Sequence, residues 1–492
     1  MNSLKCFLVI TTSLSPITIL TRSGTTIFHK ATGRFAWLTS SEPNDPGCTN
    51  QWAYDSAELP EAWDISIGSR SVSVAVIDTG VDTPHSDLSA NYDLYGLSSS
   101  FDSYLNVNSS VDIYNPNGHG TQVAGIIGAT GNNNLGVSGV CWKTDIVSMT
   151  YFDNNGNISF PTMSGAIAYA GSCNIPIINF SSGFNANILP YSVEQAIRQY
   201  SGLIVCSAGN DNRNIDTIGN EKYPACYLNL NNLIVVGAIT DDGNLRFDSN
   251  YGPYSVDLFA PGDNVWTTDK STTGYGVFGA TSCAAPFVAG TAALLKAINP
   301  DLTTAQLKAA ILDNVTQTST LSGKCVTGGK LNAYQAALSV IPTLGNTSYR
   351  FVDKDGYNWE KIVISSPSTY SFTLMGNPGL SLTIASDPAS ELVPLETATI
   401  SPGQTSISKS LLFTHPGIYY VKVNNATVND TYYTLNKTFV SYHSHSFTGP
   451  NVYLDNEYHG RACECGEYGN LMHHITKPNN PHLCIQCGGY VY

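Results

Sequence analysis

The chain has 492 residues and a formal net charge of −14, with 42% hydrophobic and 12% charged residues. This length exceeds one hydrophobic core, so we expect one large domain and at least one smaller unit. The hydrophobic content excludes a disordered chain. The negative charge argues against a nucleic-acid partner, because counterion release needs a basic surface. We expect no membrane span, because no window has the ~20 unbroken apolar residues that one requires.

The first forty residues resemble a weak export signal. The stretch CFLVITTSLSPITIL at 6–20 follows Lys5, but Thr, Ser and Pro16 interrupt its apolar run. We therefore expect residues 1–40 to be a weak signal peptide or the remnant of a propeptide. On this basis the protein is expected to be secreted or held at the cell surface.

Residues 41–342 alternate two kinds of pattern. Apolar, β-branched runs predict strands at 72–78, 145–149, 175–182, 202–210 and 232–238. Apolar residues at helical spacing predict helices at 160–171, 191–200, 282–299 and 303–314. Alternating strands and helices indicate an α/β domain with a doubly wound, mainly parallel sheet, whose chemistry lies at the carboxyl ends of the strands.

The rest of the chain has a different texture. Residues 343–440 alternate Ser, Thr and Tyr with apolar residues between Gly, Pro and Asn turns, which predicts an all-β sandwich domain. Residues 441–492 are rich in Cys and His and form a third unit, a small tail.

The stretch GATSCAAPFVAG at 279–290 has two interpretations. In the first, Thr281 or Ser282 is an ordinary helix cap and Pro286 lies in the first turns. In the second, Ser282 is a nucleophile at a helix N-terminus, where free N–H groups stabilise an oxyanion. Only partners elsewhere in the chain distinguish the two.

Three such partners occur in similar places. Asp78 ends a predicted strand, His119 opens a small-residue helix in NGHGTQVAG, and Asn210 follows another buried strand. Each alone has an ordinary structural interpretation as a turn, buried or loop residue. Together with Ser282 they supply the hydroxyl, imidazole, carboxylate and oxyanion donor that acyl transfer requires.

These motifs resemble the subtilisin-like serine peptidases, the subtilase family (peptidase S8). The resemblance rests on VAVIDTGVD at Asp78, GHGTQVAGIIGA at His119, SAGN at Asn210 and GATSCAAPFVAG at Ser282, in the family's order. It covers about residues 41–340. It implies a serine endopeptidase with an Asp78–His119–Ser282 triad, an acyl-enzyme on Ser282, an oxyanion hole that includes Asn210, and no organic cofactor.

The resemblance also suggests how substrates bind. Segments FSSG and SAG resemble the backbone strands that line the primary specificity pocket and pair with an extended protein or peptide substrate. The residues concerned are Ser181, Ser182, Gly183, Ala208 and Gly209.

Two positions beside the nucleophile depart from the family pattern. Ala280 replaces the usual Gly, and Cys283 replaces the usual Met or Leu. The position of Cys283 suggests that oxidation of its thiol, or its binding to a heavy metal, would affect activity.

A calcium site is expected near the start of the domain. The loop GNNNLGV, with Asn133, resembles the family's strong calcium site together with Asp45 and Asp87. Such oxygen ligands suit Ca²⁺. The alternative is a polar loop with incidental carboxylates.

The tail contains two close pairs of cysteines separated by eighteen residues. They are Cys463, Cys465, Cys484 and Cys487. Zinc binding and two disulfides are equally good interpretations, with zinc favoured under reducing conditions and disulfides after export.

Two other functions compete with proteolysis. The chain can be a catalytically silent relative that uses its cleft to bind peptides. Alternatively, the β domain, with its Tyr-rich strands, carries the main function as a surface adhesin.

Overall fold

The computed structural model describes most of the chain between residues 42 and 442. Within that range it leaves out residues 83, 93–117, 152–157, 186–189, 228–229, 272, 387 and 389–393. Beyond it, the backbone is described for strands β21 (Asn451–Tyr453), β22 (Tyr458–Ala462), β23 (Tyr468–His473), β24 (Thr476–Lys477) and β25 (Asn480–Cys484). The expected signal or propeptide segment at 1–40 lies outside the described residues.

The first domain is built on an eight-stranded sheet. From one edge to the other, its strands are β11 (Thr316–Gln317), β12 (Gly329–Lys330), β8 (Leu258–Pro261), β7 (Leu233–Ile239), β5 (Leu203–Ser207), β3 (Ile177–Phe180), β1 (Gly68–Asp78) and β2 (Lys143–Thr150). All neighbours are parallel except the β11–β12 pair. The predicted α/β class with a mainly parallel sheet is confirmed, and each predicted strand overlaps an observed one.

Helices cover both faces of this sheet. They are α1 (Ala53–Ser56), α2 (Leu59–Trp63), α4 (His119–Gly128), α5 (Phe160–Ser172), α6 (Tyr191–Gln199), α7 (Thr281–Ile298), α8 (Thr304–Leu312) and α9 (Ala333–Val340), with short 3₁₀ turns η1 (Pro46–Asn50) and η2 (Ser89–Asn91). One core cluster joins the sheet to α2, α4, α7, α8 and α9, and a second joins its other face to α5 and α6. The strands are buried on both sides, as their continuous apolar runs require.

Helix α7 passes through the centre of the first domain. In the part of the chain that the structure describes, it is the helix long and apolar enough to cross a membrane, but 89% of that stretch is buried. Its apolar character is therefore that of a core helix. Its N-terminal turn contains Ser282, and its C-terminal end, Ile298, reaches the second domain.

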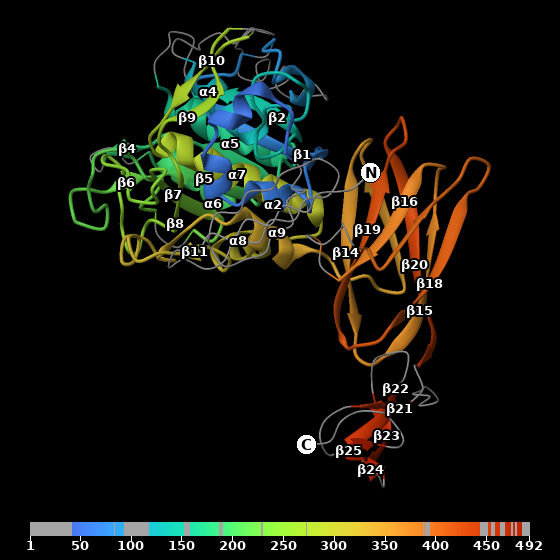
Figure 1. Ribbon diagram of the computed structural model, residues 1–492. Coiled ribbons are helices and arrows are strands. Elements are labelled where there is room, and N and C mark those ends of the chain that lie inside the picture. The colour runs from blue at the N-terminus through green and yellow to red at the C-terminus, as the bar shows by residue number, and fades with distance from the viewer. Residues whose placement is uncertain are drawn as a thin grey trace, which may run out of the picture.

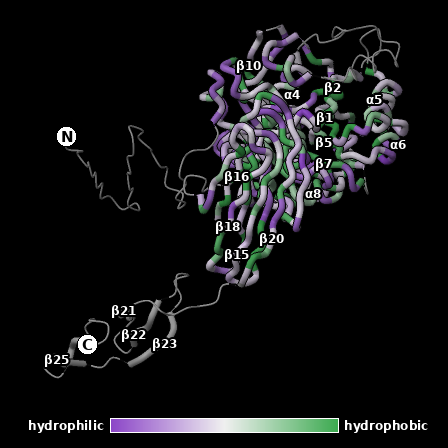
Figure 2. Tube along the Cα trace, turned by 90° about the vertical axis from the view of Figure 1, so that its right-hand side faces the viewer, coloured by the Kyte–Doolittle hydropathy of each residue, from purple (hydrophilic) through white to green (hydrophobic). Residues whose placement is uncertain are grey.

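The second domain is an antiparallel sandwich of two four-stranded sheets. One contains β13 (Thr347–Val352), β20 (Thr431–Tyr442), β15 (Ser368–Met375) and β18 (Ser406–Phe413); the other contains β14 (Tyr357–Ile364), β19 (Gly417–Asn425), β16 (Leu380–Ala385) and β17 (Glu396–Thr399). Alternate residues face a separate core that includes Phe372 and Leu382. Strands such as β18 change between polar and apolar residues along their length, whereas β5 and β7 are largely apolar (Figure 2).

The sandwich lies beside α2 and α9 of the first domain (Figure 1). Trp359 of β14 is 1% exposed and belongs to the core cluster of the α/β domain. Its Nε1 donates to the carbonyl of Asp64 at 2.9 Å, and the Tyr357 hydroxyl donates to the carbonyl of Trp63. Arg350 donates to the carbonyl of Ile298 at 2.5 Å. We call this contact region the seam.

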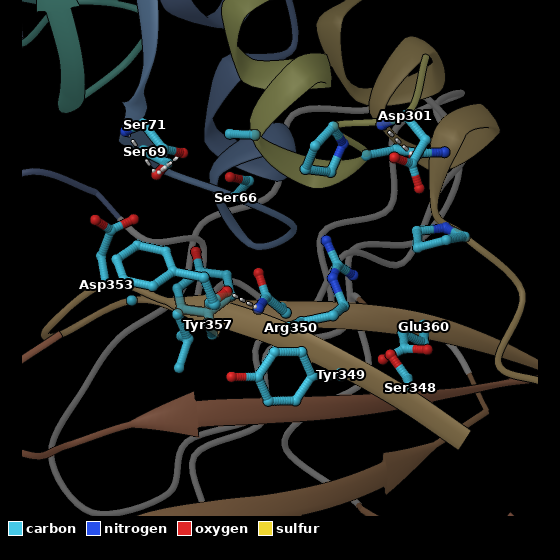
Figure 3. Close-up of a pocket in the computed structure, with 18 of the residues that line it drawn as sticks. Ser66, Ser69, Ser71, Asp301, Ser348, Tyr349, Arg350, Asp353, Tyr357 and Glu360 are labelled. Atoms are coloured by element: carbon cyan, nitrogen blue, oxygen red, sulfur yellow. Dashed lines mark hydrogen bonds between the residues drawn. The ribbon is translucent and has the colours of Figure 1, made fainter. Parts of the chain in front are cut away.

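A polar cavity of about 380 Å³ remains at the seam. Figure 3 shows Ser66, Ser69 and Asp301 of the α/β domain facing Arg350 and Glu360 of the sandwich across it. The two domains therefore meet through aromatic anchors beside a polar gap.

Candidate active site

Asp78 and His119 form a close pair at the carboxyl edge of the sheet. Asp78 is the last residue of β1 and is fully buried. Its Oδ1 accepts hydrogen bonds from the Thr79 amide at 2.7 Å and from His119 Nδ1 at 2.6 Å. Because a carboxylate only accepts, the proton lies on Nδ1 of His119 and the lone pair lies on Nε2.

His119 is the first residue of α4. A side chain at Gly120 would collide with the carbonyl of Gly80, so only glycine lets this turn approach the end of β1. The His119 ring packs edge-on against Phe278 with centroids 5.3 Å apart. Burial by itself lowers the pKa of His119, but the charge and hydrogen bond of Asp78 outweigh it, so the pKa is raised from 6.5.

Ser282 lies in the first turn of α7 and is 9% exposed. Its Oγ donates to the carbonyl of Ser181 at 3.1 Å, and the Ser181 hydroxyl donates back to the carbonyl of Ser282 at 3.0 Å. The side-chain amide of Asn179 holds the Ser181 hydroxyl at 2.9 Å. The Ser282 hydroxyl is thus hydrogen-bonded to the segment after β3 in this structure.

Asn210 completes the N-terminus of α7. Its Oδ1 accepts from the amide of Thr281 at 2.9 Å and from the Thr281 hydroxyl at 2.8 Å. These two bonds commit the side-chain oxygen to the helix and leave the Nδ2 group as the donor of this side chain. The N-cap residue itself is Ala280, which makes no side-chain cap, so the ordinary interpretation of Thr281 or Ser282 as the cap is wrong.

The two candidate substrate-binding segments lie at neighbouring strand ends. Ser181, Ser182 and Gly183 follow β3, while Ala208 and Gly209 follow β5, and β3 pairs directly with β5. The Asn250 amide donates to the carbonyl of Ala208 at 3.0 Å and steadies the second segment. Gly209 has φ +93°, a conformation that favours glycine.

The environment of Cys283 opposes the hypothesis that its thiol is reactive. Its side chain is fully buried, and burial raises its pKa well above the ordinary thiol value. Thiolate formation and access by reagents are both suppressed, so the structure opposes a reactive thiol beside Ser282.

The loop predicted to bind calcium connects all three candidate ligands. Asp45 accepts from the amides of Asn132 and Asn133, and Asp87 accepts from the Asn133 side-chain amide at 2.7 Å. Asp45 and Asp87 are buried, and burial raises the pKa of Asp87 to about 6. Among the described residues, no three or more His, Cys, Asp or Glu side chains gather as a metal cluster, so any cation here would also need carbonyl and amide oxygens.

The side chains of the four tail cysteines are not described by the structure. Cys463, Cys465 and Cys487 lie outside the described residues, and for Cys484 only the backbone of β25 is described. The choice between zinc and disulfides therefore stays a prediction.

Sequence reasoning missed several residues of this region. Phe278 contacts the His119 ring, Thr281 binds the proposed oxyanion donor Asn210, and Lys222 lies over Gly209. Proximity to the motifs was the only signal for the first two. Lys222 had none, because a single lysine before YPA carries no pattern.

Comparison with known proteins now identifies the family. The family model described as the subtilase family, peptidase S8, matches residues 69–332. This chain belongs to the subtilase family. Thermitase from Thermoactinomyces vulgaris is 32% identical over 301 residues, covering 60% of this chain and 98% of thermitase. The major intracellular serine protease of Bacillus subtilis (strain 168) is 32% identical over 263 residues, covering 51% of this chain and 79% of that protein.

A solved protease structure is also similar to this chain. A protease from Pseudoalteromonas arctica superposes with a TM-score of 0.51 at 29% sequence identity, covering 61% of this chain and 100% of that chain. The subtilase assignment confirms the resemblance read from the four motifs. The protein is a subtilisin-like serine protease, a hydrolase that acts on proteins.

Proposed function

We propose that this subtilase is an endopeptidase that forms an acyl-enzyme on Ser282. The observation that carries this proposal is the 2.6 Å Asp78–His119 pair at the end of β1, next to β3, whose following segment binds the Ser282 hydroxyl. Ser282 Oγ attacks the peptide carbonyl as His119 Nε2 accepts its proton. The C–N bond then breaks and the same proton passes to the leaving amine.

In the proposed mechanism the oxyanion is stabilised by the Ser282 backbone N–H and the Asn210 side chain. The Asn210 oxygen is bonded to Thr281, which leaves its Nδ2 as the donor group. Water then attacks the acyl-enzyme, with His119 acting again as the base. Rotation of the Ser282 hydroxyl from the Ser181 carbonyl toward His119 precedes the first attack, as is usual where catalytic hydrogen bonds tighten only with substrate bound.

Substrates are proposed to bind in an extended conformation. Segments 181–183 and 207–209 offer backbone groups at adjacent strand ends, and a substrate strand can pair with such groups whatever its side chains. Pairing of this kind requires no terminal amine or carboxylate on the substrate, so the cleavage that we propose is within chains.

The test is active-site labelling with a peptidyl phosphonate, analysed by peptide mass spectrometry. Ser282 is expected to carry the label in the native chain, and Ser282→Ala should lose both label and peptide cleavage. The exposed Ser410→Ala on the sandwich is the matched control and should keep both. A native protein that folds but takes no label at Ser282 would instead support the silent, peptide-binding relative.

Calcium is proposed as a structural ligand of the loop that holds Asn133. Asp45 and Asp87 supply buried carboxylate oxygens, and their donor chemistry fits Ca²⁺. A bound Ca²⁺ would neutralise these charges and tie η1 to the 131–137 loop.

Chelation tests the calcium proposal. EDTA is expected to lower the melting temperature by about 5–10 °C, with recovery on adding Ca²⁺. Asp87→Asn should abolish that calcium response, while Asp242→Asn, on an exposed turn, should retain it. An equal melting temperature with and without EDTA contradicts a calcium site.

A further inference from the structure

Lys222 lies where the two proposed substrate-binding segments meet. It belongs to β6 (Lys222–Tyr223), which pairs with β4 (Phe184–Asn185), the continuation of the 181–183 segment. In that pairing Lys222 is opposite Asn185. Any side chain added at Gly183 would lie 3.2 Å from the carbonyl of Tyr223.

The side chain of Lys222 also covers the second segment. A Cβ placed on Gly209 would lie 3.3 Å from Cγ and 3.4 Å from Cε of Lys222. The aliphatic stem therefore runs over the residue directly before Asn210. The lysine side chain is 17% exposed, so its charge lies in a partly dehydrated position where electrostatic contacts are stronger than in water.

The ammonium group is held by two neighbours. Lys222 Nζ contacts Asp211 Oδ2 at 2.8 Å and donates to the side-chain oxygen of Asn185. Asp211 is itself anchored, because the Asn250 amide donates to it at 3.1 Å and also binds the carbonyl of Ala208. The ion pair is thus tied to the backbone of the substrate-binding segment.

These contacts shift the pKa of Asp211. Burial raises the pKa of Asp211, but the hydrogen bonds from Lys222 and Asn250 and the charges of Lys222 and Arg213 outweigh burial, so the pKa is lowered. An ammonium has three N–H donors, and a substrate carboxylate that reaches it would compete with Asp211 as a second anionic acceptor.

We propose that Lys222 is a specificity-determining residue, and that this protease prefers an acidic side chain, Asp or Glu, immediately before the scissile bond. The proposal rests on the proposed function, in which segments 181–183 and 207–209 bind the substrate, and on the family resemblance, which implies that these segments line the primary specificity pocket. The carboxylate of such a residue would be held by the Lys222 ammonium. Without substrate, Asp211 would pair with Lys222. Its competition for the ammonium group would limit the preference for an acidic residue.

The experiment measures kcat/KM on a peptide series that varies only the residue before the cleaved bond: Glu, Gln, Leu and Lys. The native enzyme is expected to favour Glu over Gln. Lys222→Met keeps an unbranched stem over Gly209 and removes the charge, so the Glu/Gln ratio should fall about 10–100-fold, the value of one charge-assisted hydrogen bond.

A second variant acts in the opposite direction. Asp211→Asn removes the competing carboxylate, so the Glu/Gln ratio should rise. Arg213→Ala is the matched control, because it removes one positive charge near Asp211 and should change the ratio less than about twofold at an ionic strength where exposed charges are screened.

The outcomes separate this inference from the proposed function. Phosphonate labelling of Ser282 with cleavage of the Leu and Gln peptides, but an equal Glu/Gln ratio in the native enzyme and Lys222→Met, overturns the role of Lys222 alone. No labelling and no cleavage of any peptide overturns the proposed function. If Lys222→Met does not fold, an unchanged ratio in Asp211→Asn overturns the inference.

Discussion

The two ends of helix α7 are surrounded by opposite kinds of structure. At its N-terminus, Ala280 has φ +87°, and the first turn is capped from a distance by Asn210. At its C-terminus, Arg350 of the sandwich caps the carbonyl of Ile298, and the buried Trp359 packs nearby into the same core. The N-terminal end, where the proposed nucleophile Ser282 lies, is strained and polar, and we call it the proposed catalytic end. The C-terminal end meets the seam, where buried aromatic side chains lie beside a polar cavity.

This difference shows how one core helix serves activity and stability separately. Strained backbone conformations cost about 1–3 kcal/mol each and persist only where surrounding structure enforces them. The amide of Ala280 donates to the carbonyl of Gly262 at 2.8 Å, and the carbonyl of Ala280 accepts from the amide of Cys283 at 3.0 Å, so these hydrogen bonds hold the strained residue in place. Substitutions at the proposed catalytic end should therefore change rates, and substitutions at the seam should change the free energy of unfolding.

The largest expected effect is at Asp78, which the proposed mechanism couples through His119 to Ser282 at the proposed catalytic end of α7. Asp78→Asn should lower kcat/KM by about 10⁴-fold, because the imidazole loses the partner that sets its tautomer. Asp78 raises the pKa of His119, and His119 must be neutral to accept a proton. The acid limb of the pH–rate profile should therefore move to lower pH in this variant. A profile that does not move, or moves to higher pH, contradicts the assigned role of the pair, and an unchanged melting temperature would show that the proposed catalytic end contributes little to stability.

At the seam we expect a large loss of stability and little change in catalytic rate. Trp359→Ala should lower the free energy of unfolding by about 3–5 kcal/mol, the usual cost of emptying a buried Trp site, with kcat little changed at 25 °C. Denaturant unfolding followed by tryptophan fluorescence and circular dichroism measures it. Tyr432→Ala removes an aromatic side chain that is 56% exposed on the same domain and should cost far less. Equal losses from the two variants would mean that the seam is not a stabilising interface.

The smallest expected effect is a gain in stability at Ala280, at the N-terminus of α7. Ala280→Gly should raise the free energy of unfolding by about 1 kcal/mol, because relief of the positive-φ strain exceeds the extra chain entropy of glycine. Thermal unfolding at matched pH checks the sign. Ala293→Gly in the middle of α7 is the control and should destabilise, since its backbone is already helical. A loss of stability in Ala280→Gly would show that the strain at the proposed catalytic end is not significant.

Sequence alone determined the elements and the motifs. Apolar runs predicted β1, β2, β3, β5 and β7, because buried parallel strands need continuous apolar residues. The four motifs placed Asp78, His119, Asn210 and Ser282 at strand or helix ends, where a parallel sheet gathers side chains on one edge. The family followed from those motifs.

Only the tertiary structure decided how these residues are held. Asn210 bonds to Thr281 across 71 residues, Ser282 to Ser181 across 101, and Trp359 to Asp64 across 295. The Lys222 contact with Gly209 and the strain at Ala280 are equally invisible in local patterns. The periodicity of a sequence encodes which face of an element is buried, whereas contacts between distant loops depend on how whole elements pack, and no short stretch of the chain specifies that packing.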